Sequence, residues 1–297
     1  MTIPEQYRAS GRIVREVKPI VQSAVRPGVS YIDVCDIVRK EVESRGGRLA
    51  FPTGIGVNDV TAHYAPQEGD ESVFGESDLV KVDFGVHVEG YVTDTSVSVT
   101  LNPDFNLLLE ATQRALDVAI ATARREPRTG EIGREIHREA ARFGFKTIEN
   151  LTGHTVDRYT VHAGKSIPNL YMPGTQPLKS GDVFAIEPFL TLSSAAGYVV
   201  DTPSQTIFSM VARKKTGVLE LDAFAARVWE ERKTLPFTPR WYSAEFGKSR
   251  VQGIVSRLVA KRILRGYPTL VEASGSPVAQ FEHTMSLDEG GLLVVLT

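Results

Sequence analysis

Apolar residues recur at helical spacing in two pairs of segments, and each pair precedes a strand-like run that carries an acid. In residues 4–25 the apolar positions share one helical face, and Arg26-Pro27-Gly28 supplies a helix stop. Ser30 followed by Asp33 predicts the start of a second helix, which reaches about residue 44. A second pair of helices is predicted at roughly residues 105–125 and 131–143.

Period-two alternation predicts the strands. Residues 79–86 and 91–99 alternate around Glu89-Gly90, which is typical of a β-hairpin. Further strand-like runs lie at residues 182–190, 198–209, 278–287 and 291–296.

The order of helix, proline, helix and strand occurs twice. Pro27 and Pro127 are 100 residues apart, and the acids Asp83 and Glu187 in the strands that follow are 104 apart. Short strings can match by chance, so chance similarity is the alternative. A duplicated unit would bring Asp83 and Glu187 together at a pseudo-two-fold axis. We therefore expect an α/β (α+β) fold of two related halves.

Composition limits the classes of protein. The 297 residues are 42% hydrophobic and 24% charged, which suffices for a sizeable core. The chain has no uninterrupted apolar run of about 18 residues and no signal-peptide pattern at its start, so we expect a soluble, cytoplasmic protein. Cys35 is the only cysteine, which excludes an internal disulfide and predicts a buried structural thiol.

Two acids of the predicted hairpin belong on one face. Asp83 and Asp94 are 11 positions apart, and a turn centred on Val88-Glu89 would place them directly opposite each other. Carboxylates at that distance repel unless they are protonated or bridged by cations, and a two-metal cluster fits the gap. The alternative is a solvent-exposed polar face of the hairpin.

Four carboxylates and one imidazole in strand-like or strand-edge segments form the ligand set of a two-metal hydrolytic centre. The candidates are Asp83, Asp94, His154, Glu187 and Glu282. Carboxylates in apolar, β-prone surroundings are costly unless a cation or hydrogen bonds compensate them. These five residues therefore predict a metalloenzyme.

The other histidines divide by context. His63 and His162 stand in loop or strand-edge segments, from which they could donate hydrogen bonds to a substrate carbonyl or an oxyanion. His137 lies off the apolar stripe of a charged helix and is expected at the surface. His283 follows Glu282 directly, so it points away from the metals and is expected to be structural.

Several strings closely resemble methionine aminopeptidases of the type II class, in order along the whole chain. They lie at residues 51–64, 81–94, 153–169, 184–189 and 280–284. The resemblance implies the duplicated "pita-bread" fold, in agreement with the repeat. It also implies the shorter, archaeal-like form without an N-terminal extension.

The resemblance also implies roles for individual residues. Asp83 and Asp94 hold one metal, Asp94 bridges to a second ion held by His154 and Glu187, and Glu282 bridges both. The family's substrate-contacting histidines match His63 and His162, and its methionine pocket matches Phe51, Val161 and Tyr267. The two divalent ions can be Co, Mn, Fe or Zn, because such ligands accept any of these.

The implied activity is removal of N-terminal methionine from nascent proteins and peptides, with a small second residue preferred. A metal-bridging hydroxide would attack the scissile carbonyl while Glu187 shuttles the proton to the leaving amine. The alternatives are an aminopeptidase P or prolidase-like hydrolase, which cleaves before proline, and a non-enzymatic pita-bread binding protein. Metal content and the substrate cleaved distinguish the three.

Residues 210–275 read as a helical subdomain inserted into a catalytic domain of residues 1–209 and 276–297, as in type II enzymes. Helices are predicted at about residues 219–233 and 247–265. The insertion carries 13 lysines and arginines against 6 aspartates and glutamates. One hypothesis is that this basic surface contacts ribosomal RNA near the nascent-chain exit. A solvated helical surface is the more common explanation of such a surplus. We expect no membrane and no specific DNA partner.

Overall fold

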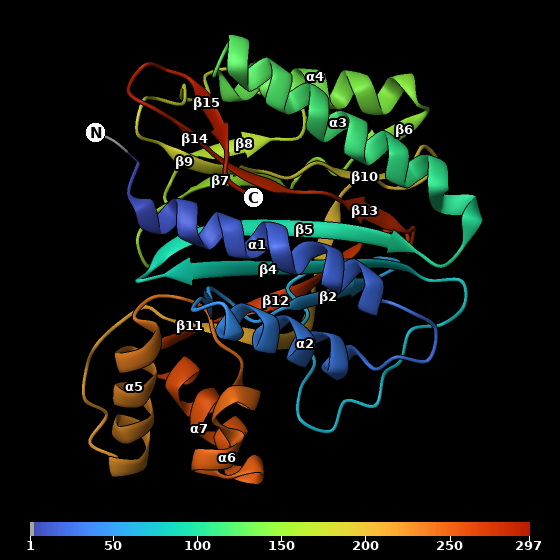
Figure 1. Ribbon diagram of the computed structural model, residues 1–297. Coiled ribbons are helices and arrows are strands. Elements are labelled where there is room, and N and C mark those ends of the chain that lie inside the picture. The colour runs from blue at the N-terminus through green and yellow to red at the C-terminus, as the bar shows by residue number, and fades with distance from the viewer. Residues whose placement is uncertain (1–2) are drawn as a thin grey trace.

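The computed structural model describes residues 3–297 as two helix-covered β layers with a further group of helices beneath them (Figure 1). The helices are α1 (Glu5–Ala24), α2 (Tyr31–Ser44), α3 (Asn106–Arg125), α4 (Thr129–Arg142), α5 (Leu219–Arg232), α6 (Ser243–Phe246) and α7 (Lys248–Ala260), with short 3-10 turns η1 (Pro103–Phe105) and η2 (Pro239–Tyr242). The strands are β1 (Arg48–Leu49), β2 (Gly54–Val57), β3 (Val60–Ala62), β4 (Leu79–Val88), β5 (Tyr91–Thr100), β6 (Phe145–Thr147), β7 (Thr152–Val156), β8 (Ser166–Pro168), β9 (Val183–Ile186), β10 (Phe189–Leu192), β11 (Val199–Met210), β12 (Leu264–Glu272), β13 (Val278–Gln280), β14 (His283–Leu287) and β15 (Leu293–Val295).

The first half is the β4–β5 hairpin covered by α1 and α2. The Ser30 side chain accepts a hydrogen bond from the Asp33 amide at 3.1 Å, which caps α2 as its sequence predicts. The apolar stripe of α1, with Val14, Val17 and Val21, is fully buried against the hairpin. Strand β4 also pairs with β1 and β2, so its centre is enclosed by neighbouring strands.

The second half repeats this plan with different strands. Helices α3 and α4 cover a five-stranded sheet in the order β15-β14-β9-β7-β8 (Figure 1). The apolar core between them includes Leu116, Ile136 and Phe184, all fully buried. Glu187 follows the last residue of β9 directly, whereas Asp83 lies within β4. The two acids therefore occupy similar, not identical, points of the repeat.

Hydrogen bonds from β5 to the β13–β14 segment join the halves. Thr95 Oγ1 donates to the Glu282 carbonyl at 2.9 Å, and Ser98 Oγ donates to the Gln280 carbonyl at 2.8 Å. Thr284 Oγ1 accepts from the Asp94 amide at 2.7 Å and donates to the Asp94 carbonyl at 2.8 Å. This seam brings the acids of the two halves together.

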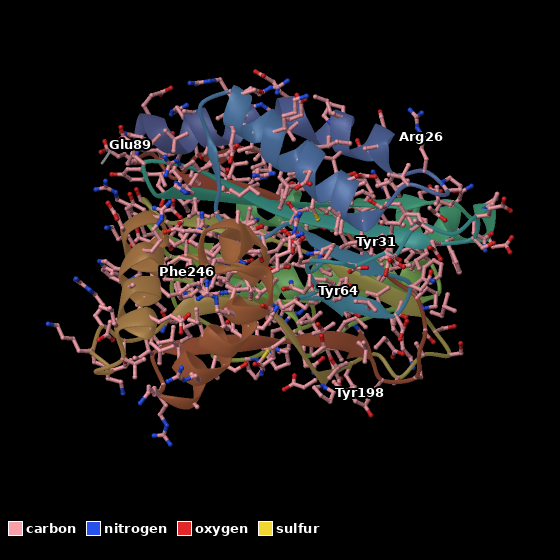
Figure 2. All side chains as sticks on the ribbon, turned by 90° about the horizontal axis from the view of Figure 1, so that it is seen from below. Arg26, Tyr31, Tyr64, Glu89, Tyr198 and Phe246 are labelled. Carbon is pink, nitrogen blue, oxygen red and sulfur yellow. The ribbon has the colours of Figure 1, made fainter. Side chains whose placement is uncertain are left out.

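The helices α5, α6 and α7 surround an aromatic core of their own. Phe224, Phe237 and Tyr242 stack with ring centroids 5.3–6.0 Å apart. In the view from below, the labelled Phe246 lies on the same side of the molecule as Glu89 at the β4–β5 turn (Figure 2). None of the helices within residues 3–297 is long and apolar enough to cross a membrane.

The helix predicted at residues 247–265 is too long at its C-terminal end. Helix α7 stops at Ala260, and Arg262 adopts a left-handed φ of 54° that turns the chain. Residues from Leu264 form β12, which pairs with β11 and β3. The proposed insertion of residues 210–275 thus includes a strand as well as helices.

A matched pair of helical glycines tests the packing of α4. An added Cβ at Gly133 would lie 2.3 Å from the Leu170 carbonyl oxygen, whereas nothing lies within 4 Å of one at Gly253 on α7. Gly133→Ala should lower the free energy of unfolding by about 1–3 kcal/mol because backbone must move. Gly253→Ala should raise it by about 0.5–1 kcal/mol through helix propensity. Urea denaturation measures both, and equal effects of the two changes would contradict the close approach of α4 to residues 168–170.

Candidate metal centre

Asp83 and Asp94 share a face of the hairpin, but they are not direct partners. Asp83 pairs with Ser96, and Asp94 pairs with Gly85, so the prediction that the two acids stand opposite each other is wrong. The turn is Glu89-Gly90, where both residues have positive φ (53° and 90°), as two-residue hairpin turns favour. It is centred one residue later than predicted, which offsets the acids diagonally by two positions.

The predicted ligands converge from both halves of the molecule. Asp94, His154 and Glu282 each offer one ligand atom, and these atoms lie within 4.8 Å of one another. His154 Nε2 is 3.5 Å from both Asp94 Oδ2 and Glu187 Oε1. Asp83 lines the same cavity. All five predicted ligands therefore border one site.

The donor set fits a divalent cation. Asp83 Oδ1, Asp94 Oδ1 and Glu282 Oε1 are buried oxygens without a hydrogen-bond donor among the described residues. Glu282 is only 1% exposed and Asp94 only 4%. A buried acceptor without a partner is costly, and carboxylates with one imidazole are hard-to-borderline ligands that suit first-row divalent ions. Cations would compensate both the missing donors and the concentrated negative charge.

Burial dominates the electrostatics of these acids in the metal-free protein. It raises the pKa of Asp94 to about 7. Burial, followed by repulsion from neighbouring carboxylates, raises the pKa values of Asp83, Glu187 and Glu282 well above their usual range. Without ions the cluster therefore tends to hold protons, and bound metal must displace them.

His154 is oriented as a neutral ligand. Its Nδ1 lies 3.4 Å from the Thr155 carbonyl, which can only accept, so Nδ1 carries the hydrogen and Nε2 keeps a lone pair toward the acids. Burial is the main cause that lowers its pKa to about 3. An added Cβ at the preceding Gly153 would lie 2.3 Å from the Ala185 carbonyl oxygen, so glycine permits the close β7–β9 approach that places His154.

His162 and His63 line the cavity beside the ligands. The His162 ring centroid lies 4.2 Å from that of His154, and burial lowers the pKa of His162 to about 4. His63 Nδ1 donates to the Pro268 carbonyl at 3.2 Å, so its Nε2 is left as an acceptor. This favours an acceptor role for His63 over the donor role expected from sequence. His63 also has a strained φ of 64°.

The cavity is lined by apolar side chains as well as by the acids. Its volume is about 240 Å³, and its wall includes the three predicted pocket residues Phe51, Val161 and Tyr267. Further lining residues not predicted from sequence are Leu151, Phe189, Ile207 and Pro236. Phe189 ends the string at residues 184–189, whereas no local motif marks the other three, because they come from segments far apart in the chain.

Sequence reasoning also missed Gln280. Its Nε2 donates to Glu187 Oε2 at 3.1 Å, and its Oε1 accepts from Ser96 Oγ at 3.0 Å. Gln280 precedes Glu282 by two positions, a spacing that places residues on one side of an extended chain and could have indicated this contact.

The remaining singled-out residues lie outside the cavity. His137 is exposed on α4, as predicted. His283 Nδ1 contacts Thr297 Oγ1 at 3.0 Å. Cys35 is buried, and burial raises the pKa of its thiol to about 12, which makes it unreactive, as expected for a structural thiol.

Comparison with known proteins agrees with this geometry. A sequence profile of metallopeptidase family M24 matches residues 5–228. The methionine aminopeptidase of Pyrococcus horikoshii is 38% identical over 286 residues, covering 96% of each chain. That of Methanothermobacter thermautotrophicus is 37% identical over 294 residues, covering 98% of each chain.

Solved structures confirm the predicted pita-bread fold. A methionine aminopeptidase from Thermotoga maritima aligns with a TM-score of 0.70 at 23% identity, over 100% of this chain and 99% of that one. A thermophilic Arx1 aligns with a TM-score of 0.83 at 17% identity, over 98% and 89%. At these identities the likeness shows the fold alone, whereas the sequence relatives show the family. The chain therefore belongs to metallopeptidase family M24 and, within it, to the methionine aminopeptidases.

Proposed function

We propose that this protein is a metal-dependent aminopeptidase that removes the N-terminal methionine from nascent polypeptides in the cytoplasm. The observation that carries the proposal is a single cavity that is lined both by the buried acid and imidazole cluster and by apolar side chains. A chain terminus can enter such a cavity with its amino group toward the acids and its side chain against the apolar wall. The archaeal relatives bear the name of this activity.

We propose two divalent ions, drawn from Co, Mn, Fe or Zn, with Asp83, Asp94, His154, Glu187 and Glu282 as ligands. When bound, such ions activate water and polarise the scissile carbonyl. The orphaned oxygens of Asp83, Asp94 and Glu282 support this assignment.

We propose that Glu187 moves the proton. Its Oε1 faces His154 and its Oε2 is held by Gln280, so the carboxylate is oriented within the cluster. It would accept a proton from the attacking water and deliver it to the leaving amine. His162 would donate a hydrogen bond to the carbonyl oxygen, and His63 Nε2 would accept one from the scissile amide.

We propose that the apolar wall determines which side chain the first residue of a substrate can carry. Phe51, Val161 and Tyr267 would surround the methionine thioether. By resemblance to the methionine aminopeptidases, we also propose a small second residue in good substrates.

Replacement of His154, the single imidazole among the candidate ligands, should reduce metal binding while the protein still folds. His154→Ala should lower release of methionine from Met-Ala-Ser by at least about 100-fold and reduce bound metal, because the second ion loses a ligand. Free methionine and metal content are measured after chelator treatment and separate reloading with Co, Mn, Fe and Zn.

His137→Ala is the matched control, because His137 is exposed on α4 and should leave both quantities unchanged. Release of residues before proline by the native protein would favour an aminopeptidase P. A protein that binds none of the four metals would favour a non-enzymatic binding protein.

Asp94 should make the metal-free protein less stable as pH rises. Its folded-state pKa is about 7, above the unfolded value near 4, so this carboxyl binds more protons in the folded state than in the unfolded state between these values. The buried histidines act in the opposite direction because burial lowers their pKa values, so the test compares native protein with the Asp94→Asn variant. The free energy of unfolding of chelated native protein, relative to that of chelated Asp94→Asn, should fall by more than about 1 kcal/mol from pH 4.5 to 7.5.

Urea titrations at several pH values measure the effect. The comparison isolates Asp94, because Asp94→Asn removes this one titrating group. A relative stability of the native protein that does not fall over this range would contradict the raised pKa of Asp94.

We further propose that the basic surface of residues 210–275 contacts ribosomal RNA. Arg257, Lys261 and Arg262 are exposed at the end of α7, and the segment's surplus of positive charge would favour a polyanion. Reversal of all three to glutamate should reduce ribosome co-sedimentation several-fold at low salt. Reversal of Arg8, Arg124 and Arg125, which are exposed outside this segment, is the charge-matched control. Equal co-sedimentation of both variants would refute the contact.

A further inference from the structure

The chain leaving α5 forms part of the cavity wall. Pro236 lines the cavity beside Phe51 and Val161. Leu235 is fully buried in the same apolar cluster as those two residues. A segment of the helical insertion, residues 232–237, therefore closes the pocket in which the substrate side chain is proposed to sit.

Arg232, the last residue of α5, links this segment to residues 49 and 50, which precede Phe51. Its Nη1 donates to the Leu49 carbonyl at 2.8 Å, and its Nη2 donates to the carbonyls of Ala50 and Pro236, both at 2.8 Å. Arg232 is only 6% exposed, and no carboxylate among residues 3–297 forms an ion pair with it. The buried guanidinium is thus solvated by three backbone carbonyls, and its Cζ lies 4.9 Å from the centroid of the Trp241 ring.

The bonded carbonyls lie next to pocket residues. Leu49 and Ala50 immediately precede Phe51, and the Ala50 amide donates to the Gly85 carbonyl at 2.7 Å. The third carbonyl belongs to Pro236 itself. The planar guanidinium has donors in a fixed fork, so it holds two segments at one separation, which a single ammonium cannot do.

A second contact braces the same segment against the loop that carries Val161. Thr234 Oγ1 donates to the Tyr159 carbonyl, two positions before Val161. The Tyr159 amide donates in turn to the Gly90 carbonyl at 2.7 Å. Hydrogen bonds thus join residues 232–237 to the loop before Phe51 and to the loop before Val161.

We propose that Arg232 is a positioning residue that sets the width of the methionine pocket by holding Phe51 and Pro236 at a fixed separation. The inference rests on the proposed function, and it assigns to the helical insertion a direct part in choosing the N-terminal side chain. A residue with only a structural role would change stability but not discrimination among side chains of similar size.

Substrate discrimination and amide exchange test the proposal together. Arg232→Met should raise KM for Met-Ala-Ser about tenfold with kcat nearly unchanged. It should also reduce the preference for N-terminal norleucine over norvaline about tenfold, since one methylene in a fitted pocket is worth that much. Hydrogen exchange of backbone amides at residues 50–55 and 235–238 should become faster. Arg227→Met is the matched control on α5, because Arg227 is partly exposed and paired with Glu231 and Glu245.

Two further variants keep the test decisive if Arg232→Met does not fold. Arg232→Lys retains the charge but not the fork, and Thr234→Val removes only the bond to Tyr159; both should shift KM and side-chain preference in the same direction. Native KM, preference and exchange in both variants would overturn the proposal. Faster exchange at residues 50–55 in a protein whose native form releases no methionine would support the positioning role and refute the proposed function instead.

Discussion

The burial of four neighbouring carboxylates, which also repel one another, is the constraint on which the rest of this structure depends. Asp83, Asp94, Glu187 and Glu282 destabilise the fold when they are charged and no cation is present. Contacts elsewhere must hold them in place. The seam between β5 and the β13–β14 segment does so with hydrogen bonds that involve the backbone of Asp94 and Glu282, leaving their carboxylates free for ligands.

The duplication places this seam between two independently packed halves. Each half has a helical pair over β structure and a separate apolar core, so each can hold its share of the acids rigidly. A site built on strands and strand ends with oriented partners, such as Gln280 behind Glu187, is pre-organised for its ions. Residues 210–275 add Pro236 and Tyr267 to a cavity wall that otherwise comes from the rest of the chain.

Much of this arrangement could be predicted from local patterns. The boundaries of α1 to α4 and the β4–β5 hairpin follow from apolar periodicity, a helix cap and turn residues. The predicted register of the hairpin was wrong because the turn is centred one residue later than assumed. The prediction that Asp83 and Asp94 share a face still holds, because the error displaces their pairing by two positions. The predicted continuation of a helix beyond Ala260 was wrong because the residues from Leu264 form β12, which hydrogen-bonds to β11 and β3. These partner strands lie outside any local sequence window.

By itself the sequence determined the ligand types, the repeat, the two helix-covered layers and the family, since each rests on residue identity or short-range spacing. Only the tertiary structure decided which atoms meet. The structure sets the diagonal offset of the two hairpin acids. Two further features depend on contacts between segments distant in the chain: the Pro268 carbonyl leaves His63 Nε2 as an acceptor, and Arg232 donates a hydrogen bond to the Leu49 carbonyl before Phe51. Such contacts are set by the packing of whole elements, which local periodicity does not encode.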